Sequence, residues 1–127
     1  MAAASILPDS EFWKDKIYFK GMNVVIRASR SIWPLVPTMN LYVKRKTFQK
    51  IGGFNEDIKI GEDMEFVQRC LKNGAKLVFF KKLKVYTSVR RFEKEGRRKY
   101  ILKLIKAFIH IRKHGFKNIP IEYEFGN

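Results

Sequence analysis

Three observations predict that this chain folds as an α/β protein. Short β-branched runs of strand length alternate along the chain with segments whose apolar residues recur at helical spacing. Apolar residues make up 46% of the chain and aromatic residues 14%, which is enough to build a core and argues against disorder. The length of 127 residues fits one domain or part of one.

The first half of the chain is predicted to contain short strands separated by loops. Residues 24–26 and 41–43 are apolar, mostly β-branched runs and are predicted strands. Residues 31–37 contain two prolines and are a predicted loop, as are residues 55–61. One or two helical turns are expected over residues 46–51, because a pair of glycines follows them.

Residues 62–73 give the clearest short helix. Its apolar residues fall on one face: Phe66, Val67, Cys70 and Leu71. Acidic residues occupy its first turn and Asn73-Gly74 ends it, which suits the helix dipole and the usual caps. Cys70 is therefore expected in the core.

The second half is predicted to hold two strands and a long helix. Residues 76–80 and 83–87 are the strands, joined by Lys81-Lys82. A helix over residues 93–113 follows and breaks at Gly115. The tail at residues 119–125 is expected to be extended at most.

The charge predicts an anionic partner. Lysine and arginine total 27 against 12 acidic residues, a net charge of +15, which suits nucleic acid, phosphate groups or an acidic membrane surface. A merely soluble basic surface is the alternative. The single cysteine excludes an internal disulfide and fits a reduced cytoplasmic setting. Residues 1–7 lack the basic start of a signal peptide.

The predicted C-terminal helix is basic and amphipathic. Ile101, Leu104, Ile105, Phe108 and Ile109 share a face, and basic residues supply much of the rest. Such a helix either lies on an anionic membrane or packs its apolar face on the domain. The sequence leaves both interpretations open.

Gly61-Glu62-Asp63 is the candidate catalytic run. It places two carboxylates where a loop becomes a helix, and a base there is held rigidly yet reaches substrate. Acids in the first turn of a helix are also common as structural caps. Spacing alone does not separate these roles.

Two further features are candidate binding residues. Arg90 and Arg91 follow the last predicted strand, and guanidinium groups bind diphosphates through two-point contacts, although a solvated basic turn would look the same. Trp33 is either a core residue or a platform on which a bound acceptor molecule stacks. His110 and His114 lie one helical turn apart without an evident third metal ligand, so they are expected at the surface.

Taken in order, these segments resemble the second half of a family 2 glycosyltransferase of the GT-A fold. The resemblance rests on N-x-x-x-[KR]-[KR]-x-x-F at residues 40–48, G-G-F-N-E at 52–56 and G-E-D at 61–63, with Arg69 and Gly74 further on. It spans residues 38–92 and, more loosely, the whole chain. It implies a mixed sheet with flanking helices: a partial GT-A domain over residues 1–92, then a basic amphipathic helix and tail over residues 93–127.

The resemblance also implies roles. Asp63 corresponds to the general base of the family, and Glu62 is its usual neighbour. Gly52, Gly53 and Phe54 shape the preceding substrate-binding loop, and Arg90 and Arg91 match a basic pair found near the donor diphosphate in some members. The implied reaction is inverting transfer of a sugar from a nucleotide-sugar donor to an acceptor hydroxyl, the acceptor being a sugar or a lipid-linked molecule.

The departures from the family concern the donor side. Full-length relatives carry about a hundred more residues upstream and a D-x-D that holds Mg²⁺ or Mn²⁺. Ala2 and Ala4 stand where those aspartates are expected, and alanine offers no oxygen ligand. The chain is therefore expected to be a truncated form that binds no metal or donor and transfers no sugar alone. It is also expected to self-associate, or to pair with a chain that supplies the missing strands.

Two other classes compete with a transferase half. One is a non-catalytic assembly or membrane-surface module derived from the same fold. The other is a nucleic-acid binder, which the charge favours, but no reading motif is present, so specific nucleic-acid binding is not expected. The predicted location is cytoplasmic, peripheral to the inner face of the membrane.

Overall fold

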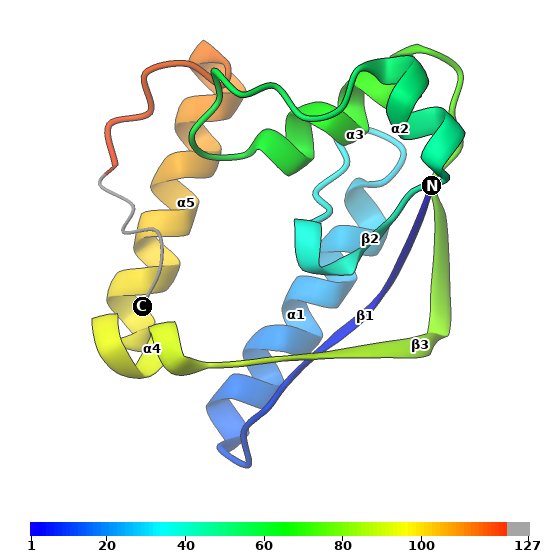
Figure 1. Ribbon diagram of the computed structural model, residues 1–127. Coiled ribbons are helices and arrows are strands. Elements are labelled where there is room, and N and C mark those ends of the chain that lie inside the picture. The colour runs from blue at the N-terminus through cyan, green and yellow to red at the C-terminus, as the bar shows by residue number, and fades with distance from the viewer. Residues whose placement is uncertain (122–127) are drawn as a thin grey trace.

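The computed structural model describes residues 1–121, so the last part of the predicted tail lies outside the described residues. The elements follow the order β1 (Ala2–Pro8), α1 (Trp13–Ser29), η1 (Thr38–Asn40), β2 (Leu41–Tyr42), α2 (Arg45–Ile51), α3 (Glu62–Lys72), β3 (Val78–Thr87), α4 (Arg90–Glu95) and α5 (Arg97–His114). Figure 1 shows strands and helices interleaved along the chain. The predicted mixed α/β class is confirmed.

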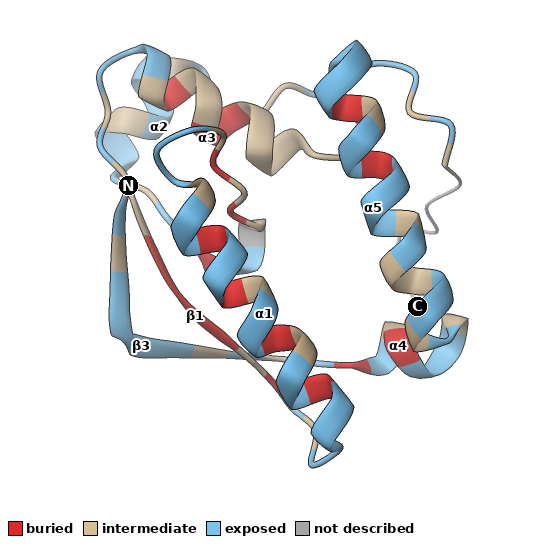
Figure 2. Ribbon diagram, turned by 180° about the vertical axis from the view of Figure 1, so that it is seen from behind, coloured by how far each residue is buried: buried red, intermediate tan, exposed pale blue. Residues whose placement is uncertain are grey.

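A three-stranded mixed sheet organises the molecule, in the order β2-β1-β3. β1 pairs antiparallel with the two residues of β2 and parallel with β3. Helix α1 lies against β1 (Figure 2). The main core joins residues of β1, α1, the loop before η1, α3 and the segment around α4: Ala3, Ile6, Phe19, Ile26, Val36, Val67, Val89 and Phe92.

The strand predicted at residues 24–26 is wrong, because these residues lie inside α1. Its buried residues Phe19, Asn23 and Ile26 recur at helical spacing and face the core, whereas Val24 and Val25 are exposed. Packing thus overrides the β-preference of the Val-Val-Ile run. The actual strand β1 is rich in alanine and was not predicted.

The two strands predicted at residues 76–80 and 83–87 form the single strand β3. Both parts pair with β1, but Ala4 aligns with Phe80 and Ser5 with Lys84. Lys81 and Lys82 therefore lie in an irregularity of the strand rather than in a turn between two strands.

Two asparagine side chains cover the edge of β1 beyond β2. The Asn40 Oδ1 atom accepts the Ala4 N–H at 2.7 Å, and its Nδ2 donates to the Ala4 carbonyl at 2.6 Å. Asn23 makes the same pair of bonds with Ile6, at 2.8 and 2.6 Å. The buried backbone groups are thereby satisfied where no strand pairs with them.

The single helix predicted over residues 93–113 is divided into α4 and α5, because Gly96 between them has φ +83°. The buried Asp15 carboxylate ties the start of α5 to α1: Arg97 donates to its two oxygens at 2.6 and 2.9 Å. The predicted division at residue 92/93 falls within α4 and stays a prediction. None of the helices within residues 1–121 is both long enough and apolar enough to cross a membrane.

The remaining predictions for local structure are confirmed. The loop at residues 31–37, the short strand β2, the turns of α2 and the helix α3 all occur where the sequence predicts them.

Candidate functional site

The Gly52-Gly53-Phe54 loop is built by a left-handed helix end and an aromatic cluster. Gly52 ends α2 with φ +87°, and its N–H donates to the Phe48 carbonyl at 3.1 Å. Gly53 has φ +73°, and a Cβ there would lie 3.1 Å from the Phe48 ring. The rings of Phe54 and Phe48 lie 4.9 and 5.4 Å from that of the buried Phe66. Both glycines are therefore required by the turn.

Arg69 fixes this loop to α3. Its guanidinium donates to the carbonyls of Ile51 and Gly53 at 2.7 and 2.8 Å. It also forms a two-point ion pair with Glu65, at 2.8 and 2.9 Å, and this bond is the main cause that raises the Arg69 pKa. One side chain thus joins the loop to the helix that carries Asp63.

Gly61 anchors the start of α3 against α5. It has φ +81°, and an added Cβ would lie 3.1 Å from the Ile111 Cδ1 atom and 3.3 Å from the Phe116 ring. Only a residue without a side chain fits both the backbone and the contact. Loop and helix start are held from two sides, by Arg69 and by α5.

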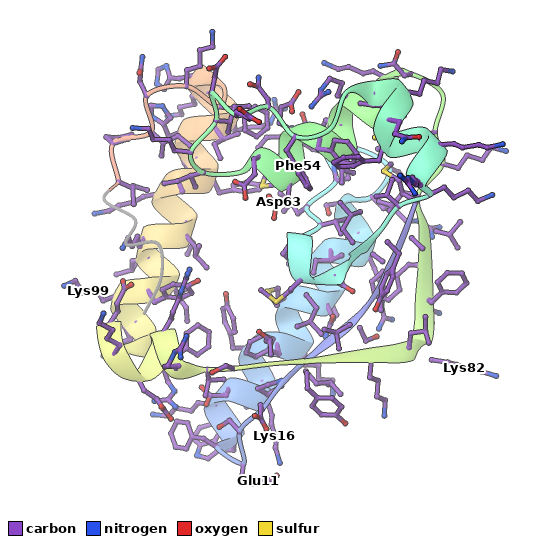
Figure 3. The ribbon with its side chains drawn as sticks, in the orientation of Figure 1. Glu11, Lys16, Phe54, Asp63, Lys82 and Lys99 are labelled. Atoms are coloured by element: carbon purple, nitrogen blue, oxygen red, sulfur yellow. The ribbon has the colours of Figure 1, made fainter. Side chains whose placement is uncertain are left out.

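Glu62 and Asp63 occupy the first turn of α3 and are partly exposed. The Asp63 Oδ1 atom accepts the Met64 N–H at 2.8 Å, so the carboxylate satisfies one backbone donor of the helix start. In Figure 3, Asp63 lies at the start of α3, near Phe54. Asp63 therefore does bond the backbone at the helix start, which is the structural role that the sequence left open, and it does so through one of its two carboxylate oxygens.

Asp63 lines neither of two hollows on the described surface. The hollow of about 250 Å³ lies between Asp57, Lys59 and Ile60, just before Gly61, and residues 116–121. The second, of about 420 Å³, lies between α1 and β3 and is lined by Arg27, Arg30 and Lys81, among others. The first hollow adjoins Gly61 through Ile60, which precedes Gly61 in the chain.

The structure does not bring Arg90 and Arg91 beside Asp63. They begin α4, next to the start of α5, whereas Gly61 contacts Ile111 near the other end of α5 (Figure 1). The rise from Arg97 to Ile111 is about 21 Å. The predicted basic pair and the predicted base thus lie at opposite ends of α5.

Trp33 packs against α5. Its ring lies 4.8 Å from that of Phe108, edge to face, and the Arg112 guanidinium lies 5.6 Å from its centroid. These contacts join the loop after α1 to the C-terminal helix. Trp33 therefore has packing partners, and it is only half-buried.

Positions 2 and 4, where the family motif would carry metal-binding aspartates, are occupied by alanines of the sheet. Ala2 and Ala4 lie inside the central strand β1, and Ala4 is fully buried. Within residues 1–121, no group of three or more histidine, cysteine, aspartate or glutamate residues could hold a metal ion. The His110 and His114 rings lie 5.0 Å apart. Ala2 and Ala4 are residues of β1 that pair with β3.

The sequence does not predict the contacts by which Arg69 and Gly61 position the site. Arg69 was noted as part of the motif, but its contacts with the loop were not predicted; its spacing of one helical turn from Glu65 was the available signal. Nothing local in the sequence reveals that Gly61 contacts α5.

The acidic start of α3, held against a glycine-rich loop, is the candidate site, and comparison with known families identifies the family of the chain. The family model described as Glycosyl transferase family group 2 matches residues 10–110. The chain belongs to this family, and glycosyl transfer is its general function. Neither a curated protein nor a solved structure matched the chain.

Proposed function

We propose that this chain forms the acceptor side of an inverting glycosyltransferase in which Asp63 is the general base. The acceptor hydroxyl oxygen attacks the anomeric carbon of the donor sugar. Its proton passes to the Asp63 carboxylate, and the bond from the anomeric carbon to the diphosphate breaks on the opposite face, releasing the nucleoside diphosphate. Such a step requires a base held rigidly in line with the acceptor.

The rigid start of α3 carries this proposal. Arg69 bonds the carbonyls of Ile51 and Gly53, and Gly61 packs on α5, so the carboxylate of Asp63 is fixed relative to the loop. The family match includes all of these positions.

We expect residues outside this site to bind the donor. A nucleotide-sugar donor with Mg²⁺ or Mn²⁺ is expected for full-length relatives, but the described residues do not fit a metal, so no step is assigned to one. Arg90 and Arg91 stay predicted ligands of the donor diphosphate. Because Arg90 and Arg91 lie at the end of α5 that is far from Asp63, their role in binding the donor has to be tested separately from that of Asp63.

We also propose that further strands complete the sheet. Among the described residues, no strand pairs with the outer edge of β2 or of β3. Large apolar side chains on β3 are exposed, including Phe80, Leu83 and Tyr86. Another chain carrying the nucleotide-binding half, or a second copy of this one, would cover such an edge. The purified chain should therefore be oligomeric by light scattering and transfer no sugar alone; a stable monomer would contradict the first point.

The test mixes the chain with a candidate nucleotide-binding half and measures release of nucleoside diphosphate from a panel of nucleotide sugars. Asp63→Asn keeps the shape of the side chain but cannot take the proton, so we expect a loss of about 10²–10⁴-fold in kcat. Glu62→Gln is the matched control on the neighbouring carboxylate and should lose far less. Equal losses for the two variants, or none for Asp63→Asn, would refute the assignment.

A non-catalytic assembly module is the second candidate. The Asp63–Met64 bond favours it, because that bond gives the carboxylate a purely structural use. In this case Asp63→Ala, which removes the acceptor of the Met64 N–H, would lower the stability of the folded chain, whereas Asp63→Asn, whose amide oxygen still accepts that N–H, would change neither stability nor transfer in a reconstituted mixture. Thermal unfolding measured beside the transfer assay separates the two candidates.

A further inference from the structure

Helix α5 carries an exposed apolar stripe. Leu102, Ile105 and Ile109 follow one another at helical spacing, and they are 57%, 47% and 46% exposed. In Figure 2 exposed residues run along most of α5, which forms one side of the molecule. We call these three residues the α5 stripe. Isolated apolar residues are normal on a surface, but a row of three on one helix face is a contact surface that needs a partner.

The opposite side of α5 cannot provide that partner, because it is already used. Ala107 and Ile111 are buried, Tyr100 lies 5.2 Å from the Phe92 ring, and Phe108 packs on Trp33. These contacts fix the rotation of α5 on the rest of the chain. The α5 stripe therefore points away from the core.

The charge on α5 indicates the chemistry of the partner. The helix contains no acidic residue. Of its seven basic residues, Arg97 pairs with Asp15 and Lys103 pairs with Glu95. The other five are Arg98, Lys99, Lys106, Arg112 and Lys113. Arg98 precedes the α5 stripe by one turn and Arg112 follows it by nearly one turn, so both ends of the apolar row are cationic. Lys99 projects away from the molecule in Figure 3.

We propose that α5 docks on an anionic lipid surface, with the α5 stripe in the acyl boundary and the basic side chains at the headgroups. Apolar burial and attraction to anionic headgroups act together in helices of this kind. A second copy of the chain is disfavoured as the occupant, because pairing two α5 helices would bring like charges together. The proposal does not depend on the role of Asp63.

The test is co-sedimentation of the whole chain with lipid vesicles. One set contains phosphatidylglycerol and phosphatidylcholine in equal parts, and the other contains phosphatidylcholine alone. We expect binding to the anionic vesicles at low salt, weakened at least about tenfold at high salt because the charges are screened. The zwitterionic vesicles should bind little.

Two double variants separate the α5 stripe from apolar exposure in general. Ile105→Gln with Ile109→Gln removes the centre of the stripe and should weaken binding about tenfold or more. Ile17→Gln with Val24→Gln removes a similar exposed apolar surface from α1 and should leave binding unchanged. All four positions are exposed, so both variants should fold, which circular dichroism checks.

Several outcomes would overturn the proposal. Equal binding to both kinds of vesicle would show that charge has no part in it, and equal losses for the two double variants would show that α5 is not the contact. Loss of a dimer in the α5 variant, with vesicle binding retained, would identify a second copy as the occupant. Binding that duplex DNA abolishes but that does not respond to the α5 variant would indicate a nucleic-acid surface instead.

Discussion

Replacing Arg69 by methionine tests whether one side chain holds the candidate site together. Methionine keeps an apolar stem of similar length but removes the guanidinium, whose central carbon lies 5.7 Å from the centroid of the Phe66 ring. The change leaves the carbonyls of Ile51 and Gly53 without these donors and the Glu65 carboxylate without its cation.

The expected loss follows from the exposure of these groups. The Arg69 and Glu65 side chains are 29% and 18% exposed, so solvent weakens their ion pair. Its contribution is about 0.5–1 kcal/mol. Each bond from the charged guanidinium to a backbone carbonyl adds about 1–1.5 kcal/mol. The sum is about 3 kcal/mol in the free energy of unfolding, or a fall of roughly 10 °C in Tm for a chain of this size.

Thermal and urea unfolding measure this loss. Lys72→Met is the control: it removes a cation from an exposed position on the same helix and should change stability by less than about 0.5 kcal/mol. Glu65→Gln should cost only the smaller, ion-pair share. The reasoning fails if Arg69→Met is as stable as Lys72→Met, because the loop would then be held by the aromatic cluster alone.

Three further substitutions test other parts of the structure. Gly61→Ala should destabilise the chain more than Gly74→Ala. Both positions have φ above +80°, which costs an alanine about 1 kcal/mol at either position, but only at Gly61 would the added Cβ be crowded, by Ile111 and Phe116. The difference in Tm between the two variants measures the cost of this crowding. The pKa of Asp15 is lowered, chiefly by its hydrogen bond to Arg97, so the stability that this carboxylate contributes is present above its ordinary pKa and is lost as the pH falls through its pKa in the folded chain. Urea unfolding midpoints measured between neutral and acid pH should show this loss, and the Asp15→Asn variant should not show it. Asn40→Ala leaves the N–H and carbonyl of Ala4 unpaired and should cost about 2–4 kcal/mol by urea unfolding, and a change below 1 kcal/mol would mean that water replaces the amide.

The sequence predicts the elements whose signals are local. Helix α3 is correctly predicted because its caps, first-turn acids and apolar face agree with one another. The run at residues 24–26 is wrongly predicted because three β-branched residues outweigh a helical pattern that includes a buried asparagine. Strand β1 has no strand signal in its alanines, and its place in the sheet is set by partners far along the chain.

The candidate site likewise has parts that the sequence predicts and parts that it does not. The Gly52-Gly53-Phe54 loop and the acidic start of α3 are visible as motifs, and the structure joins them through Arg69. The distance between that region and Arg90 could not be predicted, because it depends on the direction that α5 takes after Gly96. Contacts between side chains of different elements depend on tertiary packing, which cannot be read directly from a single sequence.

The asparagine amides on β1 also bear on the order in which the chain assembles. Their bonds to Ile6 and Ala4 close segments of 17 and 36 residues, whereas the Ser5 hydroxyl reaches the Lys81 carbonyl across 76 residues. Shorter closures cost less chain entropy. We therefore expect β1 to pack on α1 before β3 pairs with it.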